Sequence, residues 1–404
     1  MTSTLDPRTA AEHALHPLEP LSPDEMSAAS ALLKASDVFV PGSRFAYVEL
    51  AEPPKAEVVA WTTDTPWDRQ AAILLRNPRT RTTYEAVVSL TRACVVSWRA
   101  VEGAQAPLMY EEFMACDALV TSDPRWQEAM TARGVTDFGL CMVDAWASGY
   151  TGPEDAPAER RICRPLTFVR SSEFDNGYAR PVEGLVVTVD LDAMEVVDVT
   201  DHGVVPLPPL AGNYEPDLMV EPGNVTGFTE VRPALKPIVI SQPDGPSFTV
   251  EGHSVTWANW RLRIGFTPRE GLVLYDVGYV DKGELRPVLY RASLSEMYVP
   301  YGDPNPTHWI KNVFDEGEYG LGWLANSLTL GCDCLGEIFY FDGVVNDQDG
   351  EPNVIANAIC MHEEDASVGW KHTDFRTERG EVRRNRRLVI SFFATVGNYE
   401  YGLY

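Results

Sequence analysis

The chain has 404 residues, of which 45% are hydrophobic and 23% charged, and its 33 basic and 59 acidic side chains give a net charge of −26. This composition is typical of a folded globular protein and, at this length, predicts two or three domains. The negative charge repels phosphate backbones and anionic lipids, so it argues against nucleic-acid and membrane-surface functions. It favours cationic partners, or it serves solubility alone.

Residues 1–16 predict a disordered leader that lacks the apolar core of a secretory signal. No stretch approaches the ~20 consecutive apolar residues of a membrane span. We therefore expect a cytoplasmic protein without a membrane partner. Seven cysteines are too few for a disulfide scaffold. Four of them lie singly among apolar neighbours and are expected to be buried: Cys94, Cys116, Cys141 and Cys163.

Residues 17–105 predict a first small α+β domain. Ser22 and Glu25 have the spacing of a capping box, with Pro23 in the first turn, so a helix is expected to begin here. Alternating apolar residues then predict an antiparallel meander of four strands, over 43–50, 57–64, 81–90 and 93–103.

Residues 106–205 repeat this order and predict a second small α+β domain. A helical run over 110–120 is followed by a second helix that Ser122-Asp123-Pro124 begins and Gly134 ends. Strands are expected over 138–146 and 160–170, and then a hairpin over 184–203 whose turn lies near Asp192.

Proline and glycine are frequent over residues 206–228, which predicts a linker. From residue 229 to the end, helix signals nearly vanish and apolar residues alternate with polar ones between turn dipeptides. Strands are expected over 337–345, 354–365 and 383–404. The predicted fold is thus α+β modules followed by a mainly-β part: two small domains of helix plus antiparallel meander, and a partial β-sandwich over 229–404.

The last predicted strand contains a short polar and aromatic motif, "TVGNYEYG", at 395–402. It resembles the cofactor signature of the copper- and topaquinone-containing amine oxidases, which reads Thr, two residues, then Asn-Tyr-Asp/Glu-Tyr. Other segments occur in the order found in that family: "PYGDP" (300–304), "NVFDEGEYGLG" (312–322), "ICMHEED" (359–365) and "RRNRRLVISFF" (383–393). The resemblance covers nearly the whole chain and implies that the sandwich is the catalytic domain.

The resemblance assigns Tyr399 as the precursor of the quinone, because a phenol ring can be oxidised further by a metal and oxygen. Tyr301 matches the tyrosine that hydrogen-bonds the quinone, and Asn398 matches the residue that orients its ring. The residues alone leave other interpretations open. Tyr399 and Tyr401 could be packed strand residues, Tyr301 an aromatic beside a turn, and Asn398 a turn former.

Asp315 matches the catalytic base of the family, which removes a proton from the carbon next to the amine nitrogen. A carboxylate does this well when apolar neighbours raise its pKa, and Val313 and Phe314 precede it. In isolation the same aspartate could be a solvated surface group. Relatives often carry a bulky gate residue where this chain has Val313, so we expect an open channel that admits larger arylalkyl amines.

Cys334 and Cys360 match a disulfide of the family, and Cys332 is expected to be an unpaired thiol. The alternative is a zinc site at Cys332 and Cys334, although only His362 lies close to them in sequence. The family's copper ligands are a His-x-His after the cofactor tyrosine and a third histidine. The seven histidines of this chain include no His-x-His. We therefore expect a C-terminally truncated chain with no metal site of its own and copper ligands beyond residue 404.

The resemblance implies a primary-amine oxidase with copper and topaquinone as cofactors, which forms a homodimer when complete. The reaction would convert a small primary amine and O2 to an aldehyde, ammonia and hydrogen peroxide. Tyramine, phenylethylamine and histamine fit equally well. The alternatives are an inactive fragment of such an enzyme or a non-enzymatic binding protein, for which a carbohydrate-binding sandwich would use Trp257 and Trp260.

Overall fold

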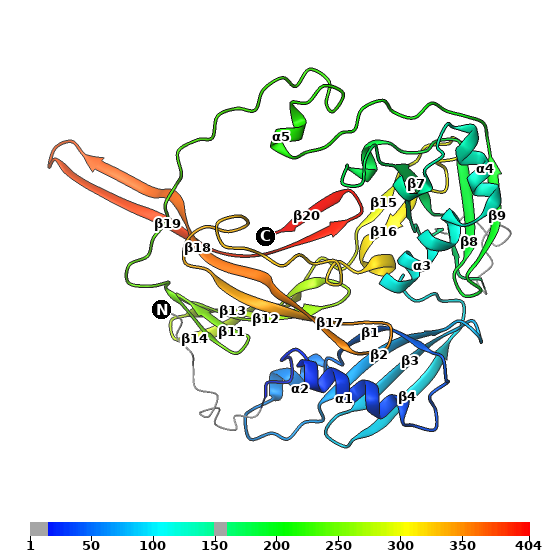
Figure 1. Ribbon diagram of the computed structural model, residues 1–404. Coiled ribbons are helices and arrows are strands. Elements are labelled where there is room, and N and C mark those ends of the chain that lie inside the picture. The colour runs from blue at the N-terminus through cyan, green and yellow to red at the C-terminus, as the bar shows by residue number, and fades with distance from the viewer. Residues whose placement is uncertain (1–14, 149–159) are drawn as a thin grey trace.

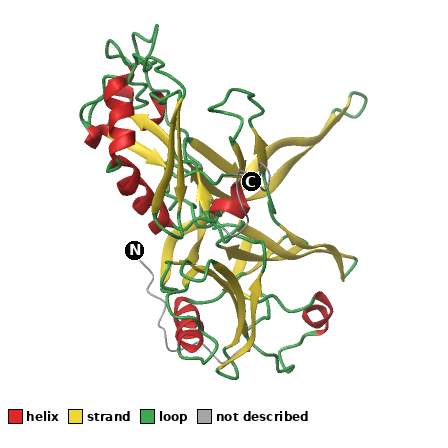
Figure 2. Ribbon diagram, turned by 90° about the vertical axis from the view of Figure 1, so that its right-hand side faces the viewer, coloured by secondary structure: helices red, strands yellow, loops and turns green. Residues whose placement is uncertain are grey.

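The structure is a computed structural model that describes residues 15–148 and 160–404. It consists of a first unit (residues 15–101), a second unit (110–201) and a β-sandwich (248–403), with a long coil between the last two (Figure 1). The predicted leader lies outside the described residues except for its last two positions. In Figure 2 the helices lie mainly on the first and second units, whereas the sandwich is almost entirely strand and loop, which confirms the predicted fold class.

The first unit is one helix packed on a four-stranded antiparallel sheet in chain order. The hydroxyl oxygen of Ser22 accepts from the backbone N–H of Glu25, and the carboxylate of Glu25 accepts from the backbone N–H of Ser22. The predicted capping box is therefore confirmed. The apolar face of the helix, with Met26 and Leu33, is buried against the sheet. The elements are α1 Pro23–Lys34, β1 Arg44–Leu50, β2 Gln70–Asn77, β3 Thr82–Ser89 and β4 Cys94–Val101.

The strand predicted over 57–64 is wrong. Residues Lys55–Ala60 form a short helix, α2, which follows two prolines and buries only Val58. The second strand of the sheet is instead β2, which was not predicted from the sequence. Its "AILL" core is a continuous apolar run without the alternation of a strand that has one face in water.

The second unit begins with two helices, as predicted. Asp123 caps the second of them by accepting from the backbone N–H groups of Arg125 and Trp126. The predicted hairpin is also confirmed, with its turn at Asp192. The elements are α3 Tyr110–Thr121, α4 Pro124–Ala132, η1 Phe138–Leu140, β5 Cys141–Asp144, β6 Ile162–Cys163, β7 Leu166–Val169, η2 Gly177–Ala179, β8 Leu185–Asp190 and β9 Glu195–Asp201.

After a coil with one short helix, α5 Pro216–Met219, the β-sandwich follows. Its first sheet has five strands: β10 Phe248–Glu251, β11 Ser254–Trp257, β12 Trp260–Thr267, β13 Gly271–Asp281 and β14 Glu284–Ala292. Its second sheet has four: β17 Phe339–Asn346, β18 Pro352–Asp374, β19 Arg379–Val396 and β20 Tyr399–Leu403. Between the sheets in sequence lie β15 Tyr298–Pro300, β16 Asn312–Phe314 and a single π-helical turn, η3 Asp315–Tyr319.

Apolar side chains of both sheets fill the space between them. Ile264 from the first sheet and Phe341, Ile359 and Phe392 from the second belong to one buried cluster. Gly271 is required at this contact, because a Cβ there would lie 2.4 Å from the ring of Phe392. The sandwich core therefore fixes the position of β19, and with it the position of the start of β20.

Buried polar contacts join the three parts. Arg76 on β2 forms an ion pair with Asp192 in the β8–β9 turn, and both side chains are almost fully buried. Asn346 at the end of β17 accepts a hydrogen bond from the backbone N–H of Val48 on β1, at 2.7 Å. These contacts hold the first unit against both of its neighbours.

The outer halves of β18 and β19 extend away from the body as a two-stranded arm, residues 367–387 (Figure 1). Nearly all of its residues are exposed. The arm carries seven basic and three acidic side chains, whereas the whole chain has a net charge of −26.

No helix in the described ranges is long and apolar enough to cross a lipid bilayer.

Candidate active site

A cavity of about 630 Å³ lies where the second unit, the β15–β16 pair, η3 and the β19–β20 turn meet. Four of the residues singled out from the sequence line it: Tyr301, Asp315, Asn398 and Tyr399. Val313, the residue at the predicted gate, lines it as well. Positions nearly a hundred residues apart in sequence therefore share one hollow.

Tyr399 is the first residue of β20, and a tight turn places it. The last strand predicted from the sequence is in fact two strands, because Val396 pairs with Tyr399 across the two-residue turn Gly397-Asn398. Gly397 has φ of +57°, which a two-residue hairpin turn requires. Asn398 is exposed in this turn, so its interpretation as a turn former agrees with the structure.

The hydroxyl groups of Tyr399 and Tyr301 lie 3.0 Å apart. Tyr301 directly follows β15, and its hydroxyl contact with Tyr399 joins the end of this strand to the start of β20. Both rings are partly exposed to the cavity, and burial raises the pKa of Tyr301 well above its ordinary value, with a further contribution from the Tyr399 hydroxyl.

Asp315 is the first residue of η3 and is only 2% exposed, so the interpretation as a solvated surface group is wrong. Burial raises its pKa, while the hydroxyl of Tyr401, which donates to Oδ2 at 3.1 Å, acts in the opposite direction. Tyr401 and Tyr399 are two positions apart on one strand and face the same side. The tyrosine pair and the carboxyl therefore lie on one wall of the cavity.

The second unit supplies residues that no motif in the sequence identifies. Trp146 stacks at an angle on Tyr301, with ring centroids 5.6 Å apart. Asp144 at the end of β5 also lines the cavity and accepts from the hydroxyl of Tyr178 at 3.3 Å. Burial raises the pKa of Asp144 to about 6. The cavity thus contains a second carboxyl group, opposite the Gly397-Asn398 turn.

The cysteines expected to form a disulfide, Cys334 and Cys360, belong to one small buried cluster. Both are free thiols in this structure, and the pKa of Cys334 is raised to about 12 by burial and by its contact with Cys360. The disulfide therefore stays a prediction.

Cys332 is an exposed free thiol. Of the four cysteines expected to be buried, Cys116, Cys141 and Cys163 are, but Cys94 is exposed. Cys94 is the first residue of β4, an edge strand whose residues are all at least partly exposed.

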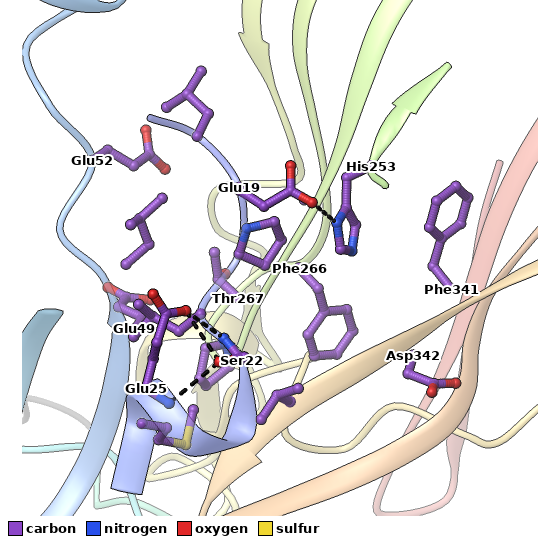
Figure 3. A pocket seen from close by; sticks show the side chains of 18 of the residues that line it. Glu19, Ser22, Glu25, Glu49, Glu52, His253, Phe266, Thr267, Phe341 and Asp342 are labelled. Carbon is purple, nitrogen blue, oxygen red and sulfur yellow. Dashed lines mark hydrogen bonds and ion pairs between the residues drawn. The ribbon is translucent and has the colours of Figure 1, made fainter. Parts of the chain in front are cut away.

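A larger cavity, of about 1060 Å³, lies between the first unit and the sandwich (Figure 3). Several of its carboxylates already have partners: Glu19 contacts His253 at 2.5 Å, and Glu25 accepts from Ser22 and from Arg69. None of the residues predicted for the site lines it. The smaller cavity is therefore the candidate active site.

Protein-family comparisons agree with this organisation. Three family models match: the AGAO-like N2 domain over 22–98, the copper amine oxidase N3 domain over 111–215, and the copper amine oxidase enzyme domain over 249–404. A primary amine oxidase of Arthrobacter sp. (strain P1) is 47% identical over 390 residues, and a histamine oxidase of Arthrobacter globiformis is 44% identical over 395. These alignments cover 96% and 97% of this chain, which spans 58% and 56% of the two relatives.

Among solved structures, a copper-containing benzylamine oxidase from Hansenula polymorpha matches with a TM-score of 0.83 and 30% identity. The match covers 96% of this chain and 61% of that one. The order of two small α+β units and a β-sandwich is therefore that of an amine-oxidase fold. The chain belongs to the copper amine oxidase family, whose members use copper and a topaquinone formed from a tyrosine.

The two cofactors of the family fit the described residues differently. Tyr399 fits the quinone precursor, because its ring reaches the cavity and its hydroxyl meets that of a second tyrosine. Copper does not fit in the same way. Residues 15–148 and 160–404 contain no group of three His, Cys, Asp or Glu side chains placed to hold a metal ion.

Proposed function

We propose that this chain supplies the amine-binding and proton-accepting part of a primary-amine oxidase. The overall reaction is R-CH2-NH2 + O2 + H2O → R-CHO + NH3 + H2O2, with Tyr399 as the precursor of the quinone. The observation that carries this proposal is the meeting of Tyr399, Tyr301 and the buried Asp315 in one cavity.

Asp315 is the proposed base. Its burial raises the pKa of its carboxyl, so the group has more affinity for a proton than a solvated aspartate. The donated hydrogen bond from Tyr401 holds Oδ2 and leaves Oδ1 to receive the proton from the carbon next to nitrogen. This fixed orientation is what a general base needs for repeated proton transfer.

Tyr301 and Asn398 are the proposed positioning residues. The hydroxyl of Tyr301, 3.0 Å from that of Tyr399, can hold the oxygen of the ring in place, and Asn398 adjoins Tyr399 in the turn. The quinone, once formed, supplies the carbonyl carbon that an amine attacks and accepts two electrons. We propose that the copper ligands come from outside the described residues.

The cavity supports a substrate with an aromatic ring on a short alkyl chain. Val313 is small for a gate residue, and Phe113, Trp146 and Tyr319 provide apolar and aromatic walls. The rings of Phe113 and Tyr319 lie 5.8 Å apart. A primary ammonium group would be attracted by the carboxyls of Asp144 and Asp315.

A homodimer and a cytoplasmic location remain part of the proposal. The basic arm is complementary in charge to a second copy of this acidic chain. Charge reversal at Arg383 and Arg384 should therefore weaken association in sedimentation velocity runs at low salt, while reversal of the exposed Arg286 on β14 should not. If the arm variant associates as strongly as the unaltered chain, the arm is not the contact.

The function is tested by extending this chain with the C-terminal segment of the Arthrobacter relative and loading it with Cu(II) in air. We expect a positive quinone redox stain and peroxide release over an amine panel. The Tyr399→Phe variant of the same protein should give neither, and the 404-residue chain alone should stay unstained. A copper-loaded extended protein without stain, or a positive stain in the Tyr399→Phe variant, would contradict the proposal.

A further inference from the structure

Two further carboxyl groups lie behind the turn that carries Asp315. Glu316 is fully buried, and its Oε1 accepts no hydrogen bond from any N–H or O–H donor of the described residues. Its carboxyl group lies beside the carboxyl of Glu296, because the backbone N–H of Met297 is 2.5 Å from Oε2 of Glu316 and 3.2 Å from Oε1 of Glu296. Two ionised carboxylates cannot occupy such a contact without strong repulsion, so one of them must carry a proton.

Glu296 is the carboxyl group of the pair that is surrounded by hydrogen-bond donors. Its Oε2 accepts from the guanidinium of Arg269 at 3.1 Å, and its Oε1 accepts from the backbone N–H groups of Glu316 and Gly317 at 3.1 and 3.3 Å. These donors stabilise a negative charge. The proton therefore belongs on Glu316, where it gives the buried Oε1 the partner that it otherwise lacks.

The pair also connects two segments of the backbone. Oε2 of Glu316 accepts from the N–H of Met297 at 2.5 Å, and the N–H of Asp315 donates to the carbonyl of Met297 at 3.0 Å. A Cβ at Gly317 would lie 2.8 Å from Oε2 of Glu296, so a larger residue here would displace that carboxylate. The turn is thus fastened to residues 296–297 at Asp315 and at the two residues that follow it.

We propose that Glu296 and Glu316 share a single proton and act as a positioning pair for the turn that bears Asp315. Loss of the shared proton places two negative charges in contact, loosens the turn and shifts Asp315 away from Tyr401. The importance of this pair for catalysis rests on the proposed function of Asp315. The role of the pair in holding the turn does not depend on that function.

Other titratable groups face this pair and are part of its electrostatics. Glu318 on the same turn accepts from the N–H of Phe314 at 3.1 Å, and burial raises its pKa to about 7. The hydroxyl of Tyr47 on β1 contacts the carbonyl of Glu316 at 3.4 Å. The remaining facing groups are Arg269, Asp315, Tyr401 and, beyond Tyr47, Glu49. Glu318 is therefore the necessary control.

The direction of the pH dependence follows from the pKa of Glu316, which burial and the contact with Glu296 raise from 4.5 to about 7. The folded state holds the proton where the unfolded chain has released it. The stabilisation is fully present below pH 4.5 and is lost as the pH rises through about 7. The turn should therefore be firmest in mild acid.

Amide hydrogen exchange of the segment 312–320, corrected for intrinsic rates, measures this directly between pH 5.5 and 8.5. We expect protection in the unaltered chain to fall by about tenfold for each pH unit above the transition. In Glu316→Gln the side-chain amide still donates to Glu296 and its carbonyl still accepts from Met297, so protection should stay high at all these pH values. Glu318→Gln, the matched control, should retain the transition.

Three results would overturn the proposal: no transition in the unaltered chain, a transition that survives in Glu316→Gln, or one that only Glu318→Gln removes. Should Glu316→Gln fail to fold, Glu296→Gln provides the second test. Without the neighbouring charge, the transition of this variant should move to lower pH, and an unmoved transition counts against the pair. Neither measurement uses amines or a quinone, so the proposed function and the positioning pair can fail separately.

Discussion

Replacing Tyr401 by Phe removes a single hydroxyl group and should make Asp315 a weaker acid. The hydroxyl donates to Oδ2 of Asp315 at 3.1 Å, and the carboxyl is almost fully buried. A hydrogen bond to a charged group contributes ~1.5–3 kcal/mol, and one pKa unit corresponds to ~1.4 kcal/mol. We expect the pKa of Asp315 to rise by about one to two units beyond the increase that burial already causes.

The measurement is a 13C NMR titration of carboxyl-labelled aspartate, in which Asp315→Asn assigns the resonance. Tyr399→Phe is the matched control, because its hydroxyl meets Tyr301 rather than Asp315. This control should change the pKa of Asp315 less than Tyr401→Phe does. A pKa that falls or stays constant in Tyr401→Phe would refute the idea that this hydroxyl stabilises the ionised base.

Three further perturbations test other parts of the structure. Arg76→Ala leaves the buried carboxylate of Asp192, between the first and second units, without its ion-pair partner. In urea titrations the free energy of unfolding should fall by about 3–5 kcal/mol, more than in a double variant in which both Arg76 and Asp192 are replaced. Gly320→Ala places a Cβ 2.8 Å from the carbonyl oxygen of Pro268 at a φ of +87°, so it should cost about 1–3 kcal/mol in the same assay. In the unaltered chain, calorimetric binding of phenylethylammonium should strengthen as the pH rises through about 6, because Asp144 becomes ionised there. Asp144→Asn should remove this pH dependence and weaken binding about tenfold at pH 7.5. Asp349→Asn, on the surface, should do neither.

Local sequence signals predicted much of the fold. The capping box at Ser22 and the hairpin around Asp192 depend on contacts within a few residues, and both are found in the structure. The strand predicted over 57–64 was wrong because its alternation arises in a six-residue helix that packs only Val58. Strand β2 was missed because an apolar run without alternation does not distinguish a buried strand from a buried helix.

In the candidate site, too, some residues could be predicted from local sequence and others depend on tertiary packing. Tyr399, Tyr301 and Asp315 could be selected because their motifs resemble those of a family, and the structure brings them to one cavity. The burial of Asp315 depends on a turn enclosed by other segments, and no local pattern reports it. Asp144 could not have been selected, since only the packing of the second unit against the β19–β20 turn places it there.

The projecting arm separates the two halves of the site along the chain. Asp315 precedes it, and Tyr399 follows it, while the inner parts of β18 and β19 pair with each other and fill the sandwich core. A protease cut at the exposed tip, beside Phe375, would therefore divide the polypeptide without breaking that inner ladder. After such a cut, the tyrosine-bearing strand would be held in the sandwich by its ladder and core contacts alone, which makes the chain suited to fragment complementation with a synthetic Tyr399 segment.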